Sequence, residues 1–486
     1  MTLTYDPGGG EAFKAAISRI PGFPAAEGLP MRFMVFESNA LLRLGGYLAQ
    51  AGAQPSQPLA VVMDETPMRR AGADLKAQVL AVLRAAGWQP QVIALTPDTT
   101  GQVHTDFGQI RQVQAQLTPT TALLAVGSGT VTDVAKHAAY CLQQEQGGPA
   151  LPFVVYQTAN SVSAYTSNMA PVFVEGVKRT LPSRYPDGLV CDLETLADAP
   201  PEMTVAGVGD LLAAFNSYAD WWLAGRLGLD HTYTEFAQTL MGPLDEIFLA
   251  NAEAIRTRTP AGMALLAKLI ALGGLAMSLS RATAPLSGFE HVVSHVLDLE
   301  AEQARRPLAQ HGSQVALATL LTTAAYDRFL TTFRPGDALE DLNAWYPSAE
   351  TMQARIESAF AYLDETGAVA AECWADYQLK LEQWHAQRAA FTAALLDWPA
   401  VQARLRALTQ RPERAAQILR AVDAPRRFQD LTPAPSEAEV RFAFLHAPLI
   451  RKRLTLGDLL VFGPGDKEAA WHSAWDRAQW VGGLEK

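Results

Sequence analysis

Cysteine is rare in this chain and is never clustered. Cys141, Cys191 and Cys373 stand far apart in 486 residues, and no two of them form a C-x-x-C pair. A zinc site made of thiolates and a disulfide framework are therefore both disfavoured. Basic residues are also in the minority, because 39 Lys and Arg face 50 Asp and Glu, for a formal net charge of -11. That sign argues against non-specific binding to nucleic acid and to an anionic membrane surface.

The N-terminus lacks the pattern of a secretory signal. Residues 1–14 contain no basic region followed by an apolar run. The most apolar segment, residues 262–280, contains Lys268 and three glycines, so we expect a buried core helix and no membrane span. A hydrophobic share of 49% and a charged share of 18% are typical of a globular protein. We therefore expect a cytoplasmic protein without membrane insertion.

Apolar runs alternate with helical patterns in the first part of the chain. The runs predict strands at residues 58–66, 90–97, 121–127 and 152–159, and the patterns between them predict helices. This alternation predicts a parallel sheet covered on both faces. After about residue 200 nearly every segment is typical of a helix.

The predicted fold class is therefore α/β, and the length favours two domains. We expect a Rossmann-like, dinucleotide-binding parallel-sheet domain at residues 1–200. An all-helical domain at residues 201–486 would bind metal and substrate. The active site is expected in the cleft between the two domains.

A glycine turn, residues 127–136 (GSGTVTDVAK), follows a predicted strand and opens a predicted helix. Such a turn can place phosphate groups against backbone N–H groups at the positive end of a helix dipole. It is not the G-x-G-x-x-G fingerprint, because Thr132 occupies the third glycine position. A plain strand-to-helix turn explains it equally well. Asp64 ends an earlier predicted strand, where an acid either accepts a hydrogen bond from a ribose hydroxyl or simply starts a turn.

Three of the nine histidines lie close together in the sequence. His291 and His295 are four residues apart, so a helix would place them on one face, and His311 follows after a loop. A catalytic zinc-type site requires about three protein ligands and one open position. Asp210 is a candidate for the carboxylate ligand, because an unpaired acid in the small-residue run 206–215 would be costly to bury. A solvated helix face without metal is the alternative.

Together these segments resemble the superfamily of dehydroquinate synthase-like proteins and iron-containing alcohol dehydrogenases. Within it they resemble the family of sn-glycerol-1-phosphate dehydrogenases in its longer bacterial form. The segments that carry the resemblance run through nearly the whole chain: residues 127–136, 165–172, 176–213, 287–295, 311–317 and 449–460.

The resemblance implies roles for individual residues. It implies one divalent ion, Zn²⁺, Ni²⁺ or Fe²⁺, with the ligands Asp210, His291 and His311. It makes His295 and Asp210 the catalytic pair, which together with Ser163 would contact the substrate. It implies NAD as cofactor, with NADP as the alternative, because Asp64 would repel a 2′-phosphate. The implied cofactor-binding residues are Asp64, Gly127, Ser128, Gly129, Thr130, Asp133, Thr158, Ser161 and Ser167.

The implied reaction is the reversible, NAD(P)H-dependent reduction of dihydroxyacetone phosphate to sn-glycerol 1-phosphate by a homodimer. The substrate is a small molecule, a polyol phosphate or its ketone. Phosphate binding requires cations, and the candidates are Lys178, Arg179, Arg451 and Arg453.

The chain departs from the family at a pair of positions, the first of which contacts the substrate in that family. Ser163 and Ala164 stand where the family usually has Asp-Gly, and serine offers a shorter, neutral hydrogen-bonding group. Three alternatives therefore stay open. The first is a dehydrogenase of another polyol or polyol phosphate. The second is a dehydroquinate synthase-like lyase, whose members typically have Glu at the position of Asp210. The third is an inactive protein that kept the fold.

Overall fold

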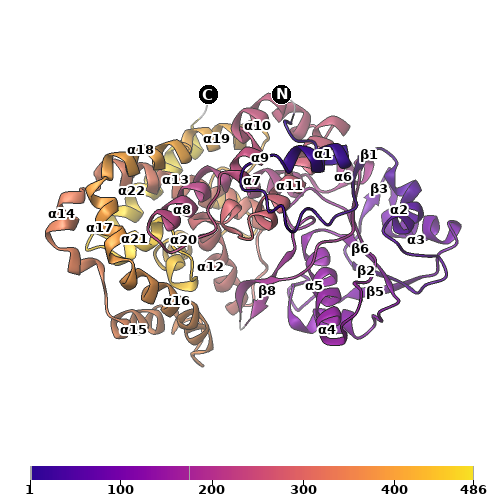
Figure 1. Ribbon diagram of the computed structural model, residues 1–486, viewed down its shortest axis with the longest axis horizontal. Coiled ribbons are helices and arrows are strands. Elements are labelled where there is room, and N and C mark those ends of the chain that lie inside the picture. The colour runs from indigo at the N-terminus through magenta and orange to yellow at the C-terminus, as the bar shows by residue number, and fades with distance from the viewer. Residues whose placement is uncertain (1–2, 175, 485–486) are drawn as a thin grey trace. The chain divides into compact units, whose positions relative to one another are not determined.

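The computed structural model describes residues 3–174 and 176–484, and these form two compact units (Figure 1). Among the described residues, unit 1 contains 3–174, 178–211 and 235–280. Unit 2 contains 176–177, 212–234 and 281–484. Because residues 235–280 return to unit 1, the units do not follow a single division of the chain after residue 200. Separate domains at 1–200 and 201–486 stay a prediction, since compactness does not test independent folding.

A six-stranded parallel sheet is the centre of unit 1, and it confirms the predicted α/β class. Its strand order is β1-β10-β7-β6-β2-β5. The strands are β1 (Phe33–Glu37), β2 (Leu59–Asp64), β5 (Pro90–Leu95), β6 (Ala122–Gly127), β7 (Phe153–Gln157) and β10 (Gly188–Asp192). Strands β1 and β10 were not predicted from the sequence. Each is a run of five residues that includes a residue other than an apolar one, so no continuous apolar run marks it.

The strand order reverses between β2 and β6. From β2 the chain continues to β5 on one side, and then returns to β6, β7 and β10 on the other side. Open α/β sheets bind ligands at such a reversal, in the crevice outside the carboxyl ends of the strands. Asp64 and Gly127 are the last residues of β2 and β6. The fold thus places both predicted cofactor residues at the expected edge of the sheet.

Helices cover both faces of this sheet. Helices α2 (Leu44–Gln50) and α3 (Leu75–Ala85) share a buried core with alternate residues of the strands, such as Val61 and Leu124. Helices α4 (Phe107–Gln114) and α5 (Gly129–Gln146) lie on the other side of β6, β2 and β5 in Figure 1. Alternate side chains of a strand point to opposite faces, so continuous apolar strands such as β6 require a cover on each side.

The remaining elements of this part of the chain are short, except for the helices α7 (Pro201–Leu211), α10 (Leu244–Arg256) and α11 (Pro260–Leu279). Two small sheets pair β3 (Arg69–Arg70) with β4 (Ala73–Asp74) and β8 (Met169–Val174) with β9 (Val177–Pro182). Two 3-10 helices are η1 (Pro7–Gly9) and η2 (Ala40–Arg43). The short α-helices are α1 (Glu11–Ile17), α6 (Leu193–Asp198) and α9 (Phe236–Met241).

Helix α11 confirms the core helix predicted at residues 262–280. Among the described residues it is the one helix that is long and apolar enough to span a membrane, with a mean hydropathy of 1.8. However, 78% of that stretch is buried inside the protein. Its apolar character is therefore explained by packing against the rest of unit 1.

Unit 2 is helical throughout its larger segments, as predicted for the second half of the chain. Its core contains large, fully buried aromatic side chains, including Trp384, Trp471 and Tyr377. Four 3-10 helices are η3 (Ala284–Leu286), η4 (Leu342–Trp345), η5 (Phe428–Asp430) and η6 (Ala447–Ile450). The α-helices are α8 (Ala214–Arg226), α12 (Phe289–Gln303), α13 (His311–Thr332), α14 (Pro335–Glu340), α15 (Ala349–Phe360), α16 (Ala368–Ala386), α17 (Arg388–Leu396), α18 (Trp398–Leu408), α19 (Pro412–Ala421), α20 (Glu437–His446), α21 (Leu456–Phe462) and α22 (Lys467–Gly483).

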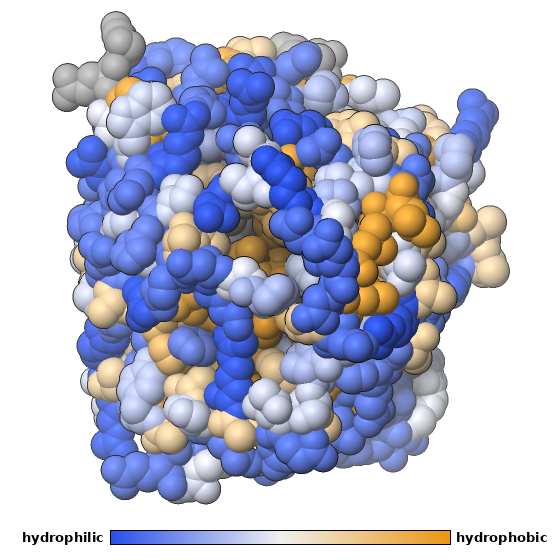
Figure 2. Space-filling view, turned by 90° about the vertical axis from the view of Figure 1, so that its left-hand side faces the viewer, coloured by the Kyte–Doolittle hydropathy of each residue, from blue (hydrophilic) through white to orange (hydrophobic). Residues whose placement is uncertain are grey.

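The surface shown in Figure 2 is mostly hydrophilic. Apolar side chains gather there in a small patch and on the floor of a hollow near the centre of the view. The exposed large apolar side chains of unit 2 are Tyr362, Leu379, Leu396 and Trp480. Single apolar residues of this kind are normal on a protein surface.

Candidate active site

Glycines let two helices of unit 1 approach the loop of residues 158–168. A Cβ atom on Gly207 of α7 would lie 2.1 Å from the backbone oxygen of Asn160. A Cβ atom on Gly274 of α11 would lie 2.3 Å from Oγ1 of Thr166. Neither distance is tolerated between real atoms, so a larger residue would push the helix and the loop apart. The small-residue run around Asp210 is thus explained by close packing of α7 against this loop.

The close approach brings Asp210 against Ser163. The backbone N–H and the hydroxyl of Ser163 both donate to Oδ2 of Asp210, at 2.9 Å each. Both residues are buried, and Asp210 is only 5% exposed. Nζ of Lys136 also donates to the carbonyl oxygen of Ala164 at 3.1 Å, which holds the same loop from the other side. The buried acid that the sequence singled out is therefore oriented by hydrogen bonds.

The three histidines of unit 2 form one cluster. His291 and His295 are one turn apart on α12, and His311 is the first residue of α13. Their ring centroids lie 5.4 to 6.1 Å apart. His291 and His295 are buried, and the side chain of His311 is 24% exposed. The predicted common face of His291 and His295 is confirmed.

Each of the two predicted histidine ligands has a polar partner at Nδ1. Nδ1 of His291 lies 3.0 Å from Oε1 of Glu290. Nδ1 of His311 lies 3.3 Å from Oγ of Ser294 and 4.0 Å from Oδ2 of Asp298. A partner at one ring nitrogen directs a metal to the other. Glu290 and Ser294 were not predicted from the sequence. The one signal for them was that each directly precedes a histidine of the cluster, His291 or His295.

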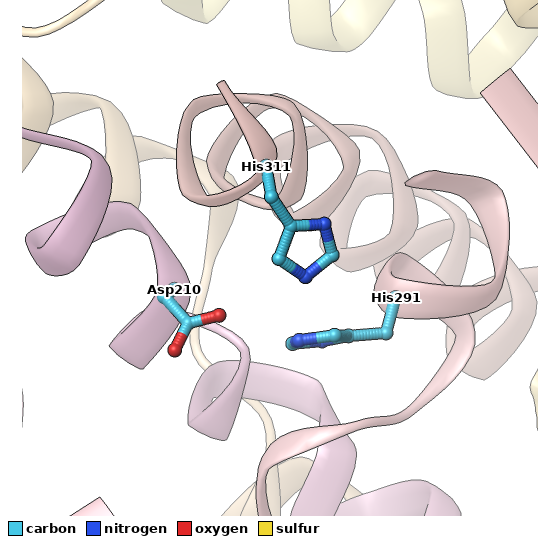
Figure 3. Close-up of side chains that lie close together, drawn as sticks. All are labelled: Asp210, His291 and His311. Atoms are coloured by element: carbon cyan, nitrogen blue, oxygen red, sulfur yellow. The ribbon is translucent and has the colours of Figure 1, made fainter. Parts of the chain in front are cut away.

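Asp210, His291 and His311 lie together, as Figure 3 shows. Each offers one ligand atom, and these atoms all lie within 4.8 Å of one another. An ion at ~2.0–2.2 Å from each of two ligand atoms holds them at most ~4.4 Å apart, so small side-chain movements would complete such a site. One carboxylate and two imidazoles form a donor set that suits Zn²⁺, Ni²⁺ or Fe²⁺. The residues therefore fit a metal of this kind.

His295 has a cationic partner, Arg451. Nη2 of Arg451 lies 2.5 Å from Nδ1 of His295. A guanidinium group can only donate, so Nδ1 of His295 must accept, and a neutral ring then carries its hydrogen on Nε2. Arg453, another predicted phosphate cation, donates to the backbone oxygen of Ser287 and to Oγ1 of Thr283. Arg453 thus holds the segment that precedes α12.

The glycines of the turn are required by packing of the chain against itself. A Cβ atom on Gly127 would lie 2.4 Å from Cβ of Val131, and one on Gly129 would lie 2.4 Å from Cγ2 of Val162. Ser128 is the N-cap of α5, and its side chain makes no capping hydrogen bond. A helix start whose N–H groups are not capped by a side chain is the feature that suits a phosphate.

Asp133 lies inside unit 1, in the second turn of α5. It forms a fully buried ion pair with Lys136, at 2.7 Å. Burial raises the pKa of Asp133, and Lys136 opposes that shift. Because its carboxylate is engaged by Lys136, the residue supports the shape of the turn from within.

The other predicted cofactor residues lie near the turn or in the loop that follows β7. Thr130 is in the first turn of α5. The N–H of Thr158 donates to the carbonyl oxygen of Gly127 at 3.1 Å. Oγ of Ser161 lies 3.2 Å from the hydroxyl of Tyr165, and Oγ of Ser167 accepts from the N–H of Met169 at 3.1 Å. Their contacts to a cofactor stay predictions.

Asp64 begins a turn at the carboxyl end of β2. Its carboxylate accepts hydrogen bonds from the N–H and the hydroxyl of Thr66, both at 3.1 Å. Nζ of Lys76 lies 3.4 Å from Oδ1 of Asp64 and 2.5 Å from its backbone oxygen. The structure therefore contains the turn that sequence analysis gave as one explanation, at the place where a cofactor ribose is expected.

Comparison with known proteins agrees with the fold. The family model "Iron-containing alcohol dehydrogenase" matches residues 35–200. Glycerol-1-phosphate dehydrogenase (NAD(P)+) of Bacillus subtilis (strain 168) is 31% identical over 322 residues, which cover 64% of this chain and 79% of that protein. The protein of the same name from Bacillus velezensis is 31% identical over 295 residues, covering 59% and 73%.

A solved structure shows that the fold is shared over nearly the whole chain. The crystal structure of a probable glycerol dehydrogenase from Sinorhizobium meliloti 1021 covers 93% of this chain and 97% of its own, with a TM-score of 0.54 and 16% identity. Fold and matches define an oxidoreductase of the iron-containing alcohol dehydrogenase class. Within that class, the chain belongs to the family of glycerol-1-phosphate dehydrogenases. The resemblance stated from the sequence is confirmed.

Proposed function

We propose that this protein reduces dihydroxyacetone phosphate to sn-glycerol 1-phosphate, reversibly, with NAD(P)H and one divalent metal ion. The observation that carries the proposal is the grouping of ligand atoms from Asp210, His291 and His311 within 4.8 Å of one another. The names of the relatives support the substrate and the cofactor. A cytoplasmic location and a homodimer remain our expectations.

The metal would be held by Asp210, His291 and His311. A divalent ion supplies Lewis acidity, which polarises a carbonyl group toward hydride attack. Ser163 restrains the carboxylate of Asp210 through two hydrogen bonds, so that the acid is aimed before a metal binds. Glu290 and Ser294 restrain the two imidazoles in the same way. This pre-organisation lowers the cost of assembling the site.

His295 is the residue that we assign to proton transfer. Arg451 donates to its Nδ1, so the neutral ring offers an N–H at Nε2. His295 would relay a proton: Nε2–H passes to the substrate oxygen while Nδ1 takes up a proton from solvent, so that the ring stays neutral. In the reverse reaction Nε2 takes the proton back and Nδ1 releases one. Arg451 would also contribute positive charge for the phosphate of the substrate.

The cofactor would lie along the carboxyl edge of the sheet. The start of α5 at Ser128, Gly129 and Thr130 would bind the pyrophosphate through backbone N–H groups. Asp64 would accept hydrogen bonds from the adenosine ribose and disfavour a 2′-phosphate. Thr158, Ser161 and Ser167 would line the nicotinamide half. A nicotinamide bound there supplies the hydride.

The test is NADH oxidation in the presence of dihydroxyacetone phosphate, after the protein is loaded with Zn²⁺ or with Ni²⁺. Dihydroxyacetone without phosphate and the variant Asp210→Ala are the two controls. We expect oxidation that needs both the metal and the phosphate and that is lost in the variant. Absence of oxidation with either metal would refute the assignment of this substrate.

A dehydrogenase of another polyol or polyol phosphate is the second candidate. It is favoured by the engagement of the Ser163 hydroxyl with Asp210 at 2.9 Å, because the family's usual acid at this position contacts the substrate. A panel of polyols and their phosphates, assayed for NAD+ reduction, separates the two candidates. The variant Ser163→Asp, Ala164→Gly, which restores the usual pair, should move the preference toward glycerol 1-phosphate.

A further inference from the structure

Glu290 is a fully buried carboxylate at the start of α12, directly before the predicted metal ligand His291. It is 0% exposed. Its Oε1 accepts the N–H of Gly288 at 2.7 Å and lies 3.0 Å from Nδ1 of His291. Its Oε2 has no hydrogen-bond partner among the described residues. Ionised groups are costly to remove from water, so contacts with the surrounding residues must offset the cost of burying this carboxylate.

Three features of unit 2 hold the side chain of Glu290 in place. At the positive end of the α12 dipole, Oε1 of Glu290 accepts the N–H of the N-cap residue Gly288. Gly288, the N-cap of that helix, has no side chain, and a Cβ atom there would lie 2.9 Å from Oε2 of Glu290. Arg453 interacts electrostatically with Glu290 and with Asp220. The carboxyl group is thus built into the helix start and is held against the imidazole of His291.

We infer that Glu290 is the positioning residue that makes His291 a metal ligand through Nε2. An ionised carboxylate can only accept, so a hydrogen bond between the ring and Glu290 fixes the hydrogen of the neutral ring on Nδ1 and leaves the Nε2 lone pair for a metal. The negative charge also raises the basicity of that ring nitrogen toward the ion. Glu290 thus acts through His291.

The inference rests on the proposed metal site, and the experiment separates the two. The apo protein is titrated with Co²⁺ against a competing chelator, and the ligand-field bands of the bound Co²⁺ are recorded at saturation. The variants are Glu290→Gln, which removes the charge, and Glu290→Asp, which keeps the charge but withdraws it from the ring. Glu300→Gln is the matched control, because Glu300 is a buried acid on the same helix, bound to Tyr362 at 2.8 Å.

We expect both Glu290 variants to bind Co²⁺ about 10–100-fold more weakly and to shift its absorption bands, while Glu300→Gln binds as the wild type does. Thermal unfolding of the apo proteins shows which variants fold, and either Glu290 variant suffices for the comparison. Wild-type affinity and unchanged bands in a folded Glu290 variant would overturn the inference alone. Failure of the wild type to bind Co²⁺ would overturn the metal site and, with it, this inference.

Discussion

Ser163 gives two hydrogen bonds to one oxygen of Asp210, from its backbone N–H and from its hydroxyl, both at 2.9 Å. Both bonds reach Oδ2, so Oδ1 is the oxygen that we expect a metal to use. The geometry depends on glycines of α7 and α11, which allow these helices to lie against the backbone of the same loop. Ser163 is thus a residue of unit 1 that orients Asp210, a predicted metal ligand.

Loss of the Ser163 hydroxyl should weaken metal binding. In Ser163→Ala the backbone N–H still donates to Asp210. We therefore expect Zn²⁺ affinity to fall about tenfold, which is the lower limit of the effect expected when a residue that hydrogen-bonds to a metal ligand is replaced. Chelator competition measures it. Thr204→Val is the control, because its buried hydroxyl, on the same helix as Asp210, has no hydrogen-bond partner among the described residues. Equal affinities of Ser163→Ala and the wild type would contradict the prediction.

Removal of the charge of Asp64 should shift the cofactor preference toward NADPH. The carboxylate would repel a 2′-phosphate, and Nζ of Lys76, 3.4 Å from it, would remain as a cation at the same place. In Asp64→Ser we expect the ratio of kcat/KM for NADPH over NADH to rise about tenfold or more, equivalent to ~1.4 kcal/mol. Addition of Lys76→Ala to this variant should reverse most of the gain. An unchanged ratio would place the adenosine ribose elsewhere.

A methyl group on Gly129 should disturb the turn through Val162. The added Cβ would meet Cγ2 of Val162 at 2.4 Å, and overpacking of this kind costs about 1–3 kcal/mol. We expect Gly129→Ala to lower the midpoint of thermal unfolding and to weaken NADH binding. The double variant Gly129→Ala, Val162→Ala removes the clashing methyl groups. It should recover part of the loss, and strictly additive effects would argue against the clash.

Asp220 should make the stability of unit 2 depend on pH. Its carboxylate accepts from Tyr326, Phe289 and Leu456. Burial, and then repulsion by Glu290, raise the pKa of Asp220 from 3.8 to about 7. The folded state therefore holds this proton more tightly than the unfolded chain does. The resulting stabilisation is complete below about pH 4 and is lost as the pH rises through about 7, by at most ~1.4 kcal/mol per pH unit.

Asp220→Asn removes the titratable carboxyl group and tests whether Asp220 causes this pH dependence. The stability of the wild type relative to the variant should fall between pH 5 and 7 and stay level above about pH 8. Thermal unfolding midpoints across this range measure the difference, in which other titrating groups cancel. Parallel curves for the two proteins would show that Asp220 does not titrate in this range.

Arg451 should control turnover through His295. Arg451→Leu removes the donor 2.5 Å from Nδ1, so the imidazole can place its hydrogen on either nitrogen. Loss of a charge-assisted hydrogen bond costs about 1.5–3 kcal/mol, so we expect kcat to fall by about 10–100-fold. The metal content should stay as in the wild type. Arg453→Leu serves as comparison, because Arg453 binds Ser287 and Thr283 and not His295. A larger effect in Arg453→Leu would contradict the role.

The sequence alone determined the class of the fold and much of the site. Continuous apolar runs at β2, β6 and β7 require cover on both faces of the sheet, and these runs can be recognised from the local sequence. The histidine spacing of four fixed a common face for His291 and His295, because helix geometry leaves no other arrangement. The acid at position 210 was visible because a charge in a run of small residues has a cost that some partner must offset.

Only the tertiary structure decided how the supporting residues are used. No local pattern pairs Ser163 with Asp210 or Arg451 with His295, since these partners are 47 and 156 residues apart. The role of the glycines of α7 and α11 also became clear only from the tertiary structure, in which the absence of a Cβ atom lets each helix contact the loop of residues 158–168. Hydrogen bonds and steric exclusion act at contact distance, so a chain specifies them through the folded arrangement and not through the order of its neighbours.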